Sequence, residues 1–263
     1  EMCIRDRVTL VSMIDFRRAN AGFHFRIRSM GCKGSSTATA CTFTALALVT
    51  GATGFGLAAC SDLDPQMPVP PEQEAVVTVG ADLRNPEQAA LAYVYAQSFE
   101  RIGRQAEVVG IRNADDRLRA VRNEAVLVSF GCTGELLGLS DPASAASLAE
   151  EYANDSTPDK QFSGEWRDRV YDAFSRSLPG EVMATDAGMA QGCADVSADN
   201  AGADLPQWLV PFYVKPALDR DDRVRVLNEI AGSLSTEDLK LMTRAVAGGA
   251  SPELVAQEWL DKA

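Results

Sequence analysis

The segment 76–130 constrains the fold of this chain more than any other part of its sequence. It holds three short apolar runs with strand character, separated by two helical segments, in the order 76–80, 86–102, 106–109, 115–122 and 125–130. Strands that alternate with helices predict a β-α-β-α-β series, with parallel strands and right-handed crossovers. Ligands of such open sheets bind beyond the carboxyl ends of the strands, so we expect a site near 80–85 and 131–134.

Capping signals predict several helix starts. Asn85 and Pro86 fit the N-cap and first residue of the helix 86–102, which Gly103 should end. Asp141 followed by a proline predicts a helix over 142–152 in the same way. The remaining expected elements are a helix at 165–177, a strand at 181–184, a helical turn toward Cys193, a strand at 208–215 that rejoins the first three, and helices beginning near 219, 235 and 251.

The N-terminal region has the order of an export signal. Basic residues between 17 and 33 precede an apolar run at 41–57, which is too short and too rich in Gly and Thr for a membrane span. Leu57-Ala58-Ala59-Cys60 then resembles the lipobox of bacterial lipoproteins, in which a diacylglycerol is attached to the cysteine and cleavage occurs just before it. We therefore expect lipidation of Cys60 and an extracytoplasmic protein anchored to the cell membrane. A plain secretory signal with a chance cysteine is the alternative.

This interpretation divides the N-terminal region further. Residues 1–7 resemble translated sequencing-adaptor sequence, which would place the natural start at Met13 or Met30. We assign 1–59 to this artefact plus the signal peptide, and 60–75 to the lipidated cysteine and a Pro-rich tether.

Charge and histidine content exclude several classes of function. From Cys60 onward, 18 basic residues stand against 34 acidic ones, a net charge of −16. Because such a surface repels phosphate, we expect no nucleic-acid binding. The single histidine, His24, precedes the predicted cleavage site. We therefore expect no Cys/His metal site, no cofactor and no enzymatic activity.

Two cysteines remain in the predicted mature domain, Cys132 and Cys193. An even pair in an exported protein predicts a disulfide, which would stabilise the fold by a few kcal/mol. Two free, buried thiols are the alternative.

Three stretches stand out by their order and spacing. They are VGADLRNPEQAALAYVYAQSFERIGRQAEVV at 79–109, AVLVSFGCTGELL at 125–137, and the C-terminal stretch 209–260. Together they resemble the extracytoplasmic solute-binding proteins of glycine betaine, carnitine and choline ABC importers. The resemblance implies an α/β fold of the type II periplasmic-binding class, with two lobes, and an ABC permease as partner.

The chain departs from this family at two places. Cys132-Thr133-Gly134 stands where the family has Tyr-Thr-Gly, which removes an aromatic ring from the expected cleft. The segment 140–209 is also shorter than the family's second lobe. We therefore predict one complete lobe from 76–139 and 210–263, with a parallel-rich sheet flanked by helices, and a reduced second lobe over 140–209.

The resemblance implies a quaternary-ammonium solute such as glycine betaine or choline. A methylated ammonium cannot donate hydrogen bonds, so aromatic faces hold it through cation–π contacts. The candidate ligand-binding residues are Glu87, Gln88, Thr133, Gly134, Trp166, Trp208 and Tyr213. The plainer alternatives are a helix cap for the first pair, a tight turn for the second pair and lobe packing for the tryptophans.

Two functions from different classes follow. The first is a solute-binding lipoprotein of an ABC importer. The second is a degenerate envelope lipoprotein that uses the same fold as an interaction scaffold. An aromatic cage facing a closable cleft would favour the first function, and a filled cleft with scattered aromatic side chains would favour the second.

Overall fold

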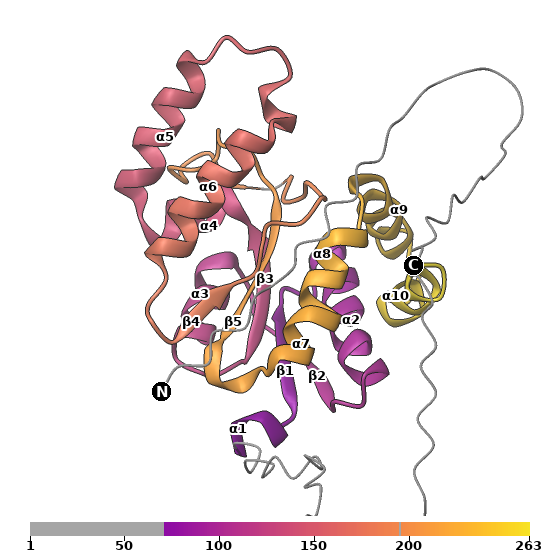
Figure 1. Ribbon diagram of the computed structural model, residues 1–263. Coiled ribbons are helices and arrows are strands. Elements are labelled where there is room, and N and C mark those ends of the chain that lie inside the picture. Colours follow the sequence, from indigo (N-terminus) through magenta and orange to yellow (C-terminus); the bar gives the residue numbers. More distant parts are fainter. Residues whose placement is uncertain (1–70, 195) are drawn as a thin grey trace, which may run out of the picture. The chain divides into compact units, whose positions relative to one another are not determined.

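The computed structural model describes residues 71–194 and 196–263, all of them within the unit Asp62–Ala263 (Figure 1). The predicted signal peptide, the lipidated Cys60 and most of the tether lie outside the described residues. Among the helices of the described part, none has the length and apolar character needed to cross a membrane.

Five strands form one mixed sheet. They are β1 (Val77–Ala81), β2 (Ala106–Gly110), β3 (Val128–Cys132), β4 (Val182–Ala184) and β5 (Leu209–Val214), in the order β2-β1-β3-β5-β4. β1 pairs in parallel with β2 and β3, which confirms the predicted series, and Val79 lies opposite both Val108 and Val128. β5 is antiparallel to both β3 and β4.

Helices connect and cover these strands. They are α1 (Pro71–Glu74), α2 (Pro86–Arg101), α3 (Ala114–Arg122), α4 (Thr133–Ser140), α5 (Pro142–Asn154), α6 (Gly164–Ser177), α7 (Arg220–Asp222), α8 (Glu229–Ser233), α9 (Thr236–Ala247) and α10 (Pro252–Leu260). A π-helical segment, Arg223–Asn228, joins α7 to α8, and short 3-10 turns lie at Lys160–Phe162 and Lys215–Ala217.

The predicted caps are present where the signal is local. The Asn85 side chain accepts hydrogen bonds from the backbone N–H groups of the first turn of α2, and Gly103 just beyond its end has a φ of +90°. The Asp141 carboxylate accepts from the Ser144 backbone N–H at 3.1 Å. Ser235 begins α9 with a complete capping box.

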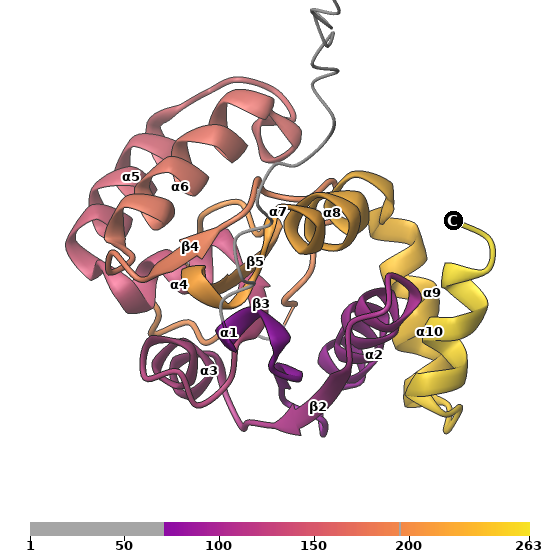
Figure 2. The ribbon, with the colours of Figure 1, turned by 60° about the horizontal axis from the view of Figure 1, so that its bottom comes forward.

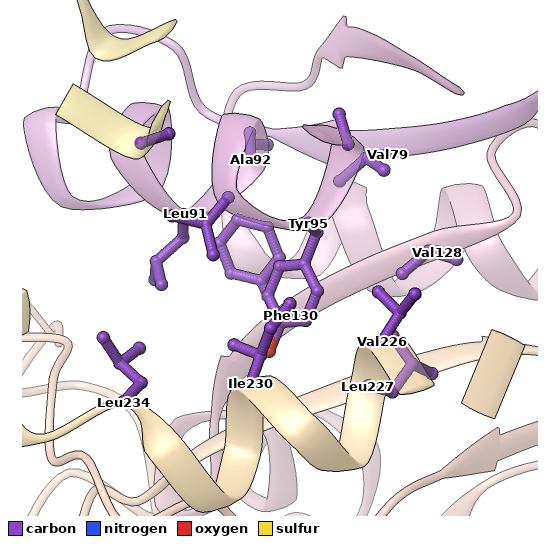
Figure 3. Close-up of a cluster of buried hydrophobic side chains, with 14 of the residues drawn as sticks. Val79, Leu91, Ala92, Tyr95, Val128, Phe130, Val226, Leu227, Ile230 and Leu234 are labelled. Carbon is purple, nitrogen blue, oxygen red and sulfur yellow. The ribbon is translucent and has the colours of Figure 1, made fainter. Parts of the chain in front are cut away.

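Each face of the sheet carries its own apolar core. On one face, α2 packs against β1, and α9 and α10 pack against α2 (Figure 1). The core of this face includes Tyr95, stacked on Phe130 at a ring-centroid distance of 5.2 Å (Figure 3). On the other face, α3, α4 and α6 pack against β4 and β5, with Phe174 edge-on to Phe212 (Figure 2). Continuous burial of β3 and β5 follows from this two-sided cover.

Two parts of the chain differ from the sequence expectation. Helix α4 begins directly at Thr133, where we expected a loop. The helical turn expected toward Cys193 is wrong, because 185–193 follows an irregular path. Backbone hydrogen bonds to distant residues hold this segment in its irregular path. The Gly188 N–H donates to the Leu209 carbonyl at 2.7 Å, and the Met189 N–H donates to the Ala231 carbonyl at 2.9 Å.

The segment 140–209, assigned above to a reduced second lobe, contributes α5, α6 and β4. Strand β4 pairs with β5 in the same sheet as β1 to β3. Residues 185–208 then lead directly into β5. Within 71–194 and 196–263, this segment therefore builds no sheet of its own.

Candidate functional site

A small polar cavity lies beyond the carboxyl ends of β1, β2 and β3, where the sequence predicts a site. Its volume is about 170 Å³. Its walls include Glu87 and Gln88 from the first turn of α2, Arg117 from α3, Glu135 from the first turn of α4, and Cys193 from the segment before β5. Residues from four separate parts of the chain therefore meet at one edge of the sheet.

The N-termini of three helices converge on this cavity. Asn85 and Asn113 cap α2 and α3 with their side chains, and α4 follows β3 without a side-chain cap. The Glu135 backbone N–H donates instead to the Gln207 side chain at 3.0 Å. These side chains satisfy N–H groups of the first turns, and the positive ends of the helix dipoles partly offset the acidic side chains around the cavity.

Two of the residues that line the cavity, Arg117 and Gln88, have buried polar side chains. Arg117 and Gln88 are each only 4% exposed. The Nε donor of Arg117 and the Oε1 acceptor of Gln88 have no hydrogen-bond partner among the described residues. A buried donor or acceptor left unsatisfied costs about 1–3 kcal/mol, so these two atoms lower the stability of the fold beside the cavity.

Burial governs the charges at this cavity. It lowers the pKa of Arg117, although the carboxylates of Glu135, Asp82 and Glu87 oppose this effect. Burial also raises the pKa of Glu135, and the positive charge of Arg117 opposes the rise. Arg84 lowers the pKa of Asp82 through its side-chain hydrogen bonds. Charges of both signs therefore lie around the same small volume.

A disulfide holds one wall of the cavity in place. Cys132 at the end of β3 is bonded to Cys193, with a Cα–Cα distance of 6.1 Å, which confirms the predicted bridge. The Cys193 backbone N–H donates to Glu87 Oε1 at 2.8 Å. A Cβ atom at position 192 would lie 2.8 Å from the same oxygen, so Gly192 permits this approach. Glu87 therefore fastens the segment before β5, and Asn85 caps α2.

Thr133 and Gly134 lie beneath the segment 200–208. The Thr133 hydroxyl donates to the Pro206 carbonyl at 3.1 Å, and its backbone N–H donates to the Trp208 carbonyl at 2.9 Å. A Cβ atom at Gly134 would lie 2.7 Å from the Gly202 carbonyl oxygen. These two candidates form a tightly packed contact and do not line the cavity.

The three aromatic candidates lie in packed positions. Trp166 in α6 donates its indole N–H to Asp155 at 2.6 Å and meets Tyr152 edge-on. Trp208 is 7% exposed and Tyr213 is 1% exposed. No aromatic side chain is among the described residues that line the cavity. The structure therefore brings Glu87 and Gln88 together at the cavity and places the aromatic candidates elsewhere.

Arg117 and Glu135 are not among the site residues that the sequence predicts. Arg117 carries a signal: Ala114, Leu118 and Val121 form the buried stripe of α3, and Arg117 shares it. A charged residue within an apolar stripe is unusual and points to a specific use. Glu135 gave no comparable signal, because α4 itself was not predicted.

Other hollows on the described part of the chain are less suited to a polar ligand. The one beside α10, of about 320 Å³, is lined by residues such as Ser98, Ile102 and Leu260. A second, of about 300 Å³, lies between α9 and α10. Neither contains a buried polar atom that lacks a partner among the described side chains.

No protein-family model and no curated protein matches the sequence. Among the solved structures that match the fold are two that each cover 72% of this chain. One is apo YehZ from Escherichia coli, with a TM-score of 0.50, 11% identity, and coverage of 72% of this chain and 98% of the other. The second is described as a glycine betaine/carnitine/choline ABC transporter, with a TM-score of 0.51, 12% identity, and coverage of 72% and 97%. The chain therefore has the α/β fold of these transporter proteins, the fold that the three sequence stretches predict.

Proposed function

We propose that this chain is an extracytoplasmic solute-binding lipoprotein that captures a small zwitterion and presents it to an ABC permease. The observation that carries the proposal is the small polar cavity, which is lined by Arg117, Gln88 and Glu135. Its place beyond the strand ends is where open α/β sheets bind ligands. Its volume of about 170 Å³ suits a molecule smaller than the drug-sized ligands of pockets of roughly 300–1,000 Å³.

The quaternary amines implied by the resemblance belong to this proposal. The carboxylate of glycine betaine or carnitine would accept from Arg117, and the cationic group would lie near Glu135. Choline has no carboxylate, so it lacks the group that Arg117 requires. With no aromatic ring on the described cavity wall, the cation would depend on charge alone.

Calorimetric titration of the purified full chain tests this proposal. Glycine betaine, carnitine, choline and glycine would each be added at up to millimolar concentration. We expect the zwitterions to bind, and Arg117→Gln to weaken them at least tenfold, because the solute loses a charged hydrogen bond. Arg119→Gln is the matched control, since Arg119 lies on the same helix and pairs with Asp115 and Asp116 at the surface. Failure of every solute to bind the parent protein would overturn the proposal.

A second function has its own support. The aromatic side chains of Trp166, Trp208 and Tyr213 are packed and scattered, and the segment 200–208 covers Thr133 and Gly134. A filled cleft of this kind suits an envelope lipoprotein that uses the fold as an interaction scaffold. That function predicts no solute binding, so the same titration separates the two.

A further inference from the structure

The carboxylates on the cavity wall differ in whether the protein already engages them. Among the described residues that line the cavity, Asp82, Glu87 and Glu135 are acidic. Asp82 is paired with Arg84 at 2.7 Å, and Glu87 Oε1 accepts the Cys193 backbone N–H at 2.8 Å. The Glu135 carboxylate forms no hydrogen bond or ion pair with another residue in the described part of the chain. Its charge therefore remains available to a solute.

The Glu135 side chain is half-buried in the first turn of α4. Its backbone N–H donates to the Gln207 side chain, and its carbonyl accepts from the Asn200 side chain, both at 3.0 Å. These two bonds fix the backbone from which the carboxylate extends. Neither carboxylate oxygen belongs to the described buried atoms that lack a partner. Because these oxygens have no partner in the described residues, they are accessible from the cavity that Glu135 lines.

We propose that Glu135 is the residue that makes this cavity select a solute with a positive charge, and that a proton on Glu135 competes with that charge. This inference rests on the proposed solute-binding function. It goes further by naming the residue that sets the charge preference, and by making solute capture depend on pH.

The charges around Glu135 support this competition. Burial raises the pKa of its carboxyl group, the positive charge of Arg117 on α3 opposes the rise, and the negative charge of Glu87 on α2 adds to it. The elements β3, α5 and α6 also pack against α4 and add no charge to this balance. Glu135 therefore takes up a proton at a higher pH than an unperturbed glutamate, whose pKa is about 4.3.

The solute and the proton act on the same carboxylate in opposite ways. A cationic group beside Glu135 stabilises the ionised form, whereas a proton removes the charge that attracts the cation. By linkage, binding of the cation releases the proton, and protonation weakens the cation. The affinity for a zwitterion should therefore fall as the pH falls through the pKa of Glu135 in the folded protein.

Two solutes of the same shape and different charge test the proposal. Glycine betaine and tert-butylacetate share a carboxylate and three methyl groups, and they differ in a positive nitrogen that is replaced by a neutral carbon. The full chain would be titrated calorimetrically with each solute between pH 7 and about pH 4, with affinity expressed per ionised solute carboxylate. We expect glycine betaine to bind about tenfold or more tightly at pH 7, and this advantage to disappear toward acidic pH.

Proton release gives a second measurement on the parent protein. Titration in two buffers that differ in their heat of ionisation counts the protons exchanged on binding. Near the pKa of Glu135, glycine betaine should release protons, and tert-butylacetate should release none.

A variant assigns the effect to its residue. In Glu135→Gln the advantage of glycine betaine should be absent at every pH, because the amide does not ionise. Glu150→Gln, at an exposed position on α5, is the matched control and should behave as the parent. Thermal melts establish that both variants are folded, and the comparison of the two solutes on the parent protein depends on neither.

The outcomes separate this inference from the function on which it rests. Equal affinity for the two solutes, or an advantage of glycine betaine that does not depend on pH, would overturn the role of Glu135 and leave solute binding intact. A pH-dependent advantage that persists in Glu135→Gln would also overturn it. No binding of either solute would overturn both the inference and the proposed function.

Discussion

Arg117 has an unusual position for a charged residue. It lies within the buried stripe of α3, and its guanidinium Nε lacks a partner among the described residues. A buried charge destabilises a fold unless other groups compensate it, and here the negative charges of Glu135, Asp82 and Glu87 do so. We interpret this as stability given up at a binding site, as is common where a residue is kept for function.

Glu135 provides a pH-dependent test of how buried charge at this cavity affects the stability of the fold. Burial raises its pKa in the folded protein, so its contribution to stability is present below the unfolded pKa and is lost as the pH rises through the folded pKa. We expect Glu135→Gln to melt at a higher temperature than the parent at pH 7, and the difference to vanish below about pH 4. Thermal melts across this range provide the measurement.

The control for this variant is Glu150→Gln, at an exposed position on α5. It should show no comparable change with pH. A lower melting temperature of Glu135→Gln at pH 7 would contradict the prediction, because it would mean that the ionised carboxylate stabilises the fold through Arg117.

At the scale of elements, the sequence predicts structure well where the determinants are local. Asn85, Asp141 and Ser235 each cap a helix as expected, because a cap depends on residues within one turn. The parallel order of β1, β2 and β3 also follows from the alternation of strands and helices.

Helix α4 was missed for a physical reason. Gly134 and Gly138 lower its intrinsic helix propensity. Their presence is explained only by distant residues, since a Cβ at Gly138 would collide with the Asn200 side chain and a Cβ at Gly134 with Gly202. The cavity was foreseen in its place beyond the strand ends. The role of Arg117 in the cavity was not predicted, because the residues around Arg117 come together only in the folded chain.

Trp208, just before β5, gives a test at this scale. Its side chain is 7% exposed and lies apart from the cavity, so Trp208→Ala should remove packing alone. We expect the free energy of unfolding to fall by about 3–5 kcal/mol, and the melting temperature to fall by roughly 2–4 °C for each kcal/mol. Solute affinity should not change. Thermal melts measure the stability of the variant, calorimetric titration measures its solute affinity, and Trp208→Phe is the milder control. A variant that keeps its stability but binds solute more weakly would contradict the prediction, because it would mean that the indole contacts the ligand.

For the whole molecule, the described residues form one sheet with an apolar core on each face and a small polar cavity at one edge. The resemblance implied two lobes, and the cavity lies at one edge of this single sheet. Cys193 and Val196 line the cavity, and the disulfide to Cys132 and the hydrogen bond to Glu87 hold Cys193 there.

The anchoring of the molecule is predicted from its lipobox and can be tested directly. Cys60→Ser should abolish incorporation of a labelled fatty acid in growing cells, because the thiol that accepts the lipid is missing. Cys41→Ser, within the predicted signal peptide, is the matched control and should keep the label on the mature protein. Equal label on the Cys60→Ser variant and the parent would contradict the lipoprotein interpretation.

The disulfide has a consequence for when binding begins. In the reducing interior of a cell, Cys132 and Cys193 would stay thiols, and the segment that carries Cys193 would not be tethered to β3. Because the Cys193 N–H holds Glu87 at the cavity wall, we expect the newly made chain to acquire affinity only after oxidation outside the membrane. A precursor awaiting export would then leave the cell's internal store of the proposed solute untouched.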